Sequence, residues 1–135
     1  MNEDEAYLDV AKRYIESCEE HISNGINIQE VVGFKSYHAF ESIAGAYNSH
    51  YGHAVPRGHA RKLNTFVINT RRNHLANSRA IAAQAILLSS MRNKYLYPEK
   101  TGTNFKRPQD QISLTDAKQL VRKVKGIVRQ VEGII

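Results

Sequence analysis

The sequence predicts an all-α protein, an antiparallel up-and-down bundle of four to five helices. Apolar residues recur at three- and four-residue steps along most of the chain, which is the period of an amphipathic helix. No segment alternates apolar and polar residues in the manner of a half-buried strand. The connections between periodic segments are short, and short connections favour antiparallel neighbours. A length of 135 residues fits one domain, so we expect a single domain over residues 1–135.

The first predicted helix ends at Asn24-Gly25, where glycine supplies a left-handed cap. Its apolar stripe consists of Tyr7, Ala11, Tyr14, Cys18 and Ile22, and charged residues lie between them in the sequence.

The second predicted helix begins at Asn27, whose side chain can cap it while Glu30 reaches back three residues later. It continues to a break at Tyr51-Gly52. Gly33, inside this segment, indicates a kink or a helix boundary.

A loop over residues 50–59 leads to the third predicted helix, whose apolar stripe is Leu63, Phe66, Val67 and Thr70. The fourth predicted helix runs from about Ala80 to Tyr95, with Asn73, Asn77 or Ser78 as its cap. Residues 81–88 are apolar nearly all round the helix. We therefore expect this helix to be the most buried element.

Residues 98–111 hold two prolines, a glycine and many polar groups, which predicts an exposed loop. The final predicted helix begins near Ser113 or Thr115, either of which can cap it. Its buried stripe is Leu120, Val124, Ile127, Val128 and Val131.

The net charge of +6 lies mainly in the middle of the chain and in the last predicted helix, whereas residues 1–30 are acidic in excess. Such a field favours a polyanionic partner, phosphate above all. The alternative is the solvated surface of a mildly basic protein. No segment has the roughly 18 consecutive apolar residues that cross a membrane, and the acidic N-terminus lacks a signal core. With a single cysteine, Cys18, we expect a soluble cytoplasmic protein.

Several kinds of site are not indicated by the sequence. His50, His53 and His59 share a loop, but no cysteine pair or carboxylate accompanies them, so we interpret them as surface groups and expect no metal. Glycine-rich phosphate loops are absent, and we expect no cofactor. Cys18 lies on an apolar stripe and is interpreted as a packing residue.

The segment from Met91 to Pro98 combines an arginine, an amide and a tyrosine at the end of a long helix. A guanidinium grips a phosphate through two parallel hydrogen bonds, an amide orients it, and a third group can transfer a proton. Arg92, Asn93 and Tyr97 are therefore the candidate catalytic residues. A tyrosine with a pKa near ~10 is a poor base. The alternative is that Arg92 extends from the core while Tyr97 packs against Tyr95.

Three segments together resemble the HEPN family (higher eukaryotes and prokaryotes nucleotide-binding). The Tyr-His-Ala step in residues 36–44 is similar to the family's early helix. The Arg92-Asn93 pair and the residues to Pro98 are similar to its signature at the end of a central helix. Residues 114–120 are similar to its closing helix. The resemblance covers roughly residues 36 to 131.

The resemblance implies an all-α bundle that pairs as a homodimer. Active members of the family are metal-independent endoribonucleases with an arginine and, four to six residues later, a histidine, and two copies form one composite site. Members act with nucleotidyltransferase antitoxins, in phage defence and in RNA processing, and others are inactive binding modules. Arg92 and Asn93 match the motif, but its histidine positions hold Tyr97, Pro98 and Glu99. His53, His59 and His74 are further imidazoles that the sequence does not place.

Three functional hypotheses follow. The first is an RNA- or nucleotide-binding protein with weak or no catalysis, in which Arg92 grips a phosphate, Asn93 orients it, and Tyr97 stacks a base or donates a hydrogen bond. The second is a metal-independent endoribonuclease of toxin or defence type, with a composite dimer site and a nucleotidyltransferase-type antitoxin as partner. The third is a non-catalytic protein-interaction module whose basic last helix binds an acidic protein. The candidate phosphate- or RNA-binding residues are Arg92, Lys94, Arg79 and Arg72.

Overall fold

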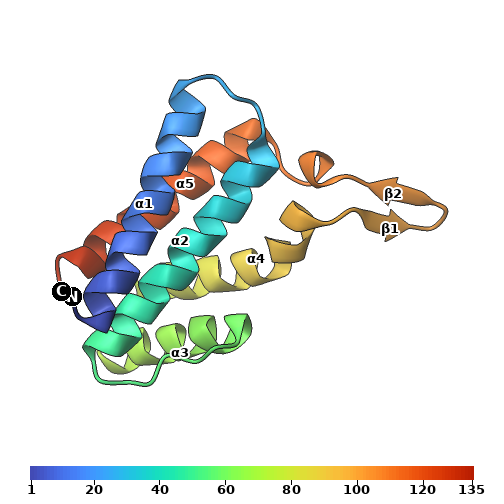
Figure 1. Ribbon diagram of the computed structural model, residues 1–135. Coiled ribbons are helices and arrows are strands. Elements are labelled where there is room, and N and C mark those ends of the chain that lie inside the picture. Colours follow the sequence, from blue (N-terminus) through green and yellow to red (C-terminus); the bar gives the residue numbers. More distant parts are fainter.

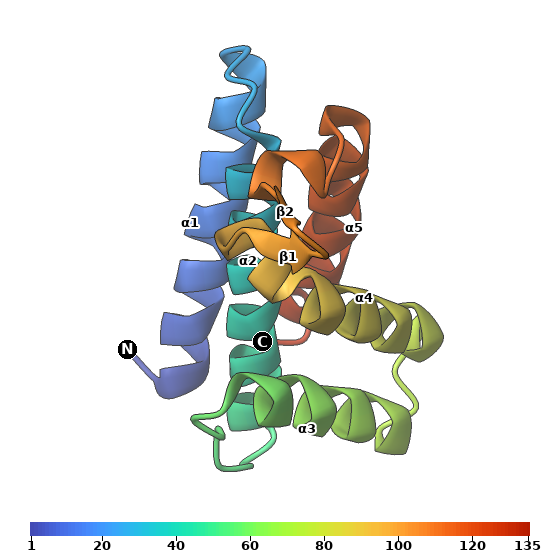
Figure 2. The same cartoon turned by 90° about the vertical axis from the view of Figure 1, so that its right-hand side faces the viewer.

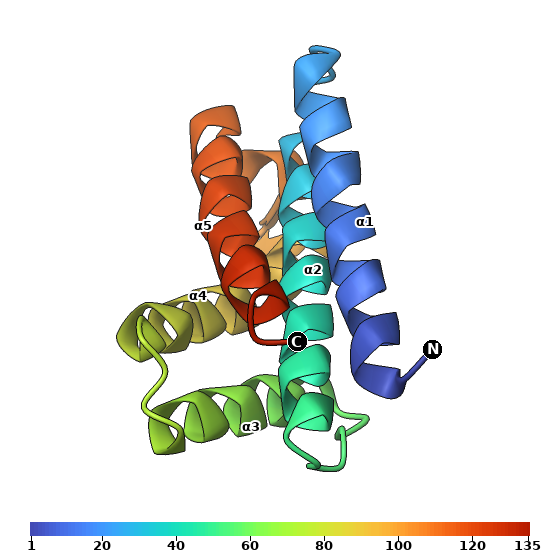
Figure 3. The ribbon, with the colours of Figure 1, turned by 90° about the vertical axis from the view of Figure 1, so that its left-hand side faces the viewer.

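The computed structural model describes residues 1–135 and confirms an all-α bundle of five helices. Helices α1, α2 and α5 lie side by side, whereas α3 and α4 form an antiparallel pair that crosses them (Figures 1 and 3). None of the helices is both long and apolar enough to span a membrane. The helices are α1 (Glu3–Ser23), α2 (Gln29–His50), α3 (His59–Arg72), α4 (Ser78–Leu96) and α5 (Leu114–Glu132).

Helix α2 is the centre of the fold, because it packs against each of the other four helices. Its side chains contribute Tyr37, Phe40 and Tyr47 to the hydrophobic core. The prediction that α4 would be the most buried element was wrong. Ile86 is 74% exposed and Leu87 45% exposed, because α4 lies at the periphery and one side of it faces solvent.

The N-terminal end of α2 also differs from the prediction. Ile28, not Asn27, precedes the helix, and no side chain caps it. The helix is continuous through Gly33, so this glycine is neither a kink nor a boundary. Its role is close packing: a Cβ added at Gly33 would lie 2.9 Å from Cε1 of the buried Tyr95. The missing side chain lets the end of α4 approach α2.

At α4, Asn77 precedes the helix but no side chain caps it, so the cap predicted there is not formed. Two other helix ends agree with the sequence analysis. Gly25 follows α1 with a φ of 67°, and the Ser113 hydroxyl accepts a hydrogen bond from the Asp116 backbone N–H at 3.1 Å. The predicted stripe of α5 is buried throughout.

Residues 98–111 are exposed for the most part, as predicted, but they are not an irregular loop. Strands β1 (Glu99–Thr101) and β2 (Asn104–Lys106) form an antiparallel hairpin, and a short 3-10 helix (Pro108–Asp110) follows. Three-residue strands are too short for an alternating pattern to stand out. The hairpin projects from the helical body beyond the end of α4 (Figures 1 and 2).

Replacing Gly33 by alanine tests this close packing. We expect Gly33→Ala to lower the free energy of unfolding by about 2 kcal/mol, because the new methyl group overlaps the buried Tyr95 ring, which must shift to make room for it. Gly126→Ala is the matched control within α5, since an added Cβ there meets nothing within 4 Å. The control should raise stability by about 0.5 kcal/mol. Urea denaturation measures both, and a neutral Gly33→Ala would contradict the packing.

Candidate functional site

The antiparallel pairing of α3 and α4 places the start of α3 beside the end of α4. This pairing brings His59 and Arg92 together, although they are far apart in sequence. The Arg92 Nη2 and the His59 Nε2 are 3.2 Å apart. An imidazole therefore stands beside Arg92, but α3 supplies it and not the residues that follow Arg92 on α4.

A carboxylate on α2 orients this imidazole. The Glu41 carboxylate oxygens are 2.9 Å from His59 Nδ1. A guanidinium only donates hydrogen bonds, so His59 Nε2 must accept from Arg92 and the proton of the neutral ring must lie on Nδ1. Both contacts favour this same tautomer. The lone pair of Nε2 consequently points toward Arg92, and the His59 side chain is 49% exposed.

Glu41 is a buried charge, with only 5% of the residue exposed. Lys62 Nζ, from the next turn of α3 after His59, lies 3.1 Å from its carboxylate. Burial alone would raise the pKa of the Glu41 carboxyl, but hydrogen bonds from His59, Lys62 and Tyr37 outweigh burial and hold this pKa below its ordinary value. Glu41 is therefore ionised at neutral pH.

Arg92 is held by neutral groups only. Its guanidinium lies 5.6 Å above the centre of the Tyr37 ring, and Nη1 donates to the Asn93 side-chain oxygen at 3.2 Å. It forms no ion pair with a carboxylate, and its buried Nε has no hydrogen-bond partner. An arginine in this state retains its capacity to bind an anion.

The charges of the cluster leave a positive excess. We define the Arg92 cluster as Tyr37, Glu41, His59, Lys62 and Arg92. One carboxylate faces two permanent cations, so the cluster carries about one net positive charge with His59 neutral. Burial is the main cause of a raised pKa at Tyr37, with the nearby Glu41 carboxylate adding to it, so the phenol remains protonated.

The neighbouring His38 is a packing residue. It stacks on Tyr14 with ring centres 5.1 Å apart and meets Phe34 edge to face. Burial lowers its pKa, which favours the neutral ring.

The predicted site residues are not all brought together. Asn93 contacts Arg92, but Tyr97 is 60% exposed at the C-terminal end of α4, and its side chain makes no hydrogen bond. Lys94 lies two residues from Arg92 and forms no ion pair. Arg72 and Arg79 lie at the other end of the α3–α4 pair, about 20 Å along the helix axis from Arg92.

Sequence reasoning missed Glu41, Lys62 and Tyr37, although two signals were present. Glu41 is the only acidic residue between Val31 and Pro98, and it stands within an otherwise apolar run. The spacings Tyr37/Glu41 and His59/Lys62 place each pair on one helix face. Only the tertiary structure could show that these two faces meet.

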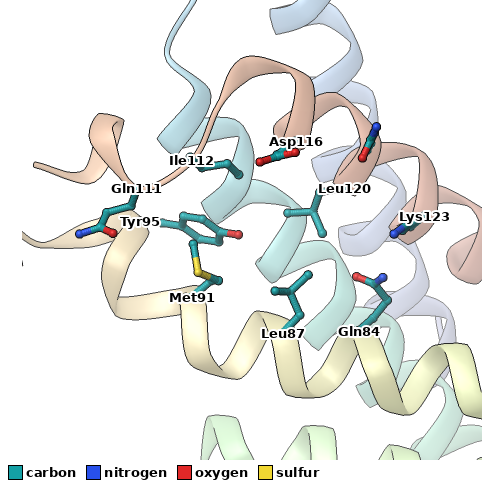
Figure 4. A pocket seen from close by; sticks show the side chains of 10 residues that line it. Gln84, Leu87, Met91, Tyr95, Gln111, Ile112, Asp116, Leu120 and Lys123 are labelled. Carbon is teal, nitrogen blue, oxygen red and sulfur yellow. The ribbon is translucent and has the colours of Figure 1, made fainter.

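A separate groove lies between α4 and α5, with a volume of about 370 Å³. Figure 4 shows the Tyr95 ring lying across it, with Met91 and Leu87 on one side and Leu120 on the other. Burial raises the pKa of Tyr95 to about 12. None of the Arg92 cluster lines this groove, so the two features are distinct.

The remaining histidines and the cysteine stand apart from the cluster. His50 pairs with Asp4 at 3.0 Å, and Cys18 is buried, with its pKa raised to about 11 by burial. The burial predicted for Cys18 is thus confirmed. The structure contains no group of three side chains able to hold a metal ion.

Comparison with known proteins adds no relative. No family model, curated protein or solved structure matches this chain. The HEPN resemblance therefore stays a prediction from the sequence motifs.

Glu41→Gln tests the electrostatic role of the buried carboxylate. We expect a loss of about 2 kcal/mol of stability at neutral pH, because charge-assisted hydrogen bonds from His59 and Lys62 become weaker. The pKa of Glu41 is lower in the folded state than in the unfolded chain. The ionised carboxylate therefore stabilises the fold at any pH above its ordinary pKa, and this stabilisation is lost as the pH falls through the lowered pKa. The native protein should therefore lose stability between about pH 5 and pH 3 more steeply than the variant.

Urea denaturation at several pH values measures this difference. Asp110→Asn is the control, since its carboxylate also has a lowered pKa beside Arg107 but lies at the surface, with 43% of the side chain exposed. Solvent screening should leave its effect small. Parallel pH profiles of native protein and Glu41→Gln would show that Glu41 is not the group responsible.

Proposed function

We propose that the protein is a HEPN-like RNA- or nucleotide-binding protein that holds a phosphate at Arg92. The unpaired guanidinium carries the proposal, because it has no carboxylate partner and a buried Nε without a hydrogen bond. Phosphate oxygens satisfy a guanidinium through parallel hydrogen bonds. A bound phosphate would replace the weak neutral contacts that Arg92 makes to Asn93 and His59.

The surroundings of Arg92 favour an anion as well. Lys62 adds a second cation, and Glu41, the one carboxylate of the cluster, is already occupied by His59 and Lys62. The net charge of +6 attracts polyanions over longer range. Phosphate groups, and therefore RNA, are negatively charged and complement both the positive Arg92 cluster and the positive net charge of the chain.

A homodimer is part of the proposal. Ile68 and Ile86 are 48% and 74% exposed on the adjacent helices α3 and α4, and a second copy of the chain could cover them. The same helix pair carries His59 and Arg92, so pairing there would bring two clusters onto one assembly. Sedimentation equilibrium of the native protein measures this state directly.

Arg92→Ala tests the binding function. We expect it to weaken binding of a mixed-sequence RNA by at least about tenfold and to reduce the slope of log affinity against log salt by about one, since one phosphate contact is lost. Arg79→Ala is the matched control, because it removes the same charge from the other end of α4. Fluorescence anisotropy at several salt concentrations provides both quantities.

Two outcomes would contradict the proposal. Equal losses in Arg92→Ala and Arg79→Ala would mean that only the overall charge matters. Absence of RNA binding by the native protein even at low salt would remove the nucleic-acid function and leave the protein-interaction module.

Metal-independent endoribonuclease activity is the second candidate, and one observation favours it: the Glu41–His59 pair aims a neutral Nε2 at the position beside Arg92. In such a reaction Nε2 accepts the proton of a ribose 2′-hydroxyl, and the oxygen attacks the adjacent phosphorus. The bond from phosphorus to the 5′-oxygen breaks, and water protonates that oxygen. The products are a 2′,3′-cyclic phosphate and a 5′-hydroxyl. Arg92 would stabilise the charge on the phosphoryl oxygens.

His59→Gln tests this candidate. We expect it to reduce cleavage of RNA in EDTA by at least about 100-fold, since proton transfer contributes factors of that size. Tyr97→Phe is the control at the motif position and should cleave at the native rate, because the Tyr97 hydroxyl forms no hydrogen bond with the Arg92 cluster. Gel separation of end-labelled RNA measures the rate, and full activity in His59→Gln would exclude His59 as the base. Binding without cleavage by the native protein would leave the first function alone.

A further inference from the structure

The β1–β2 hairpin is not explained by the fold or by the Arg92 cluster. Its strands pair with each other and make no substantial contact with the helices. An isolated two-stranded hairpin is marginally stable in water, and this one has no core of its own. Figure 1 shows it projecting away from the body, directly after α4.

One face of the hairpin carries an aromatic ring and a cation side by side. Phe105 is 65% exposed and takes part in no aromatic pair or core contact. Its cross-strand partner is Lys100, so the two side chains leave the same face of the ribbon. Neither Lys100 nor Lys106 forms an ion pair. Glu99, the one carboxylate of the strands, accepts a hydrogen bond from Gln111 at 3.4 Å.

We propose that the hairpin is an arm that binds single-stranded RNA, with a base stacked on Phe105 and an adjacent phosphate beside Lys100. This inference rests on the proposed RNA-binding function. Exposed aromatic rings beside lysines are the means by which proteins bind unpaired bases, since every base has a face that can stack. A duplex keeps its bases stacked on one another and offers no such face.

The arm stands within reach of an RNA held at Arg92. Leu96 is four positions along the helix from Arg92, and Lys100 is four positions further along the extended chain. These distances add to at most roughly 20 Å, a span that a few nucleotides of single strand can cover. Tyr97 lies on this path and is 60% exposed, so it offers a second ring for a base between the two sites.

A tryptophan at position 105 tests the inference, because the chain has no tryptophan of its own. We expect the fluorescence of Phe105→Trp to fall when a 12-nucleotide single-stranded RNA binds, because a base stacks on the indole. Ile26→Trp is the control, since Ile26 is 45% exposed and lies in the loop between α1 and α2, outside the hairpin. Its fluorescence should not change.

Phe105→Ala supplies the second arm of the experiment. It should bind the same RNA about tenfold more weakly, bind a matched RNA duplex with native affinity, and melt at the native temperature because the ring is exposed. Native affinity of Phe105→Ala for the single strand, with no quenching in Phe105→Trp, would overturn the arm while leaving the Arg92 function intact. Equal quenching by the duplex, or a response to anionic lipid vesicles but not to RNA, would overturn it too. If the native protein binds no RNA at all, both proposals are wrong.

Discussion

The structure around the candidate site depends on the hydrogen bonds that satisfy the Glu41 carboxylate, which is buried on α2. An ionised carboxylate is costly to remove from water unless hydrogen bonds and opposite charges compensate. Here α3 provides both, through His59 and Lys62 in adjacent turns. These hydrogen bonds join the start of α3 to α2 beside the end of α4 that carries Arg92.

This constraint determines the chemistry that the cluster can perform. The carboxylate holds the His59 proton on Nδ1 and leaves Nε2 as an acceptor beside a guanidinium. Tyr37 and Asn93 hold that guanidinium without neutralising it. A guanidinium without a carboxylate partner and an imidazole whose Nε2 acts as an acceptor are the two groups needed to bind a phosphodiester and to take the proton of the adjacent 2′-hydroxyl. An imidazole thus lies beside Arg92, but it comes from α3 and not from the residues that follow Arg92 in the sequence.

The sequence predicted what depends on local pattern. The helix periodicity, the Gly25 and Ser113 caps and the buried stripe of α5 all follow from neighbouring residues. The burial of α4 was misjudged because an apolar run does not reveal whether a helix is central, and Ile86 faces solvent for that reason. The meeting of His59 with Arg92 depends on the antiparallel α3–α4 pair, and no spacing along the chain encodes it. Glu41, as the lone acid in the middle of the chain, was the clearest sequence signal that could have located the site.

The orientation of the His59 ring is the most direct test of this description. A long-range proton–nitrogen NMR correlation spectrum of histidine-labelled protein reports which ring nitrogen carries the proton. The spectrum is recorded at mildly alkaline pH, and the His59 signals are assigned by their absence from the spectrum of His59→Gln. We predict protonated Nδ1 and unprotonated Nε2 in the native protein, and a shift toward the other tautomer in Glu41→Gln. A native ring protonated on Nε2, unchanged by Glu41→Gln, would contradict the central role of the buried carboxylate.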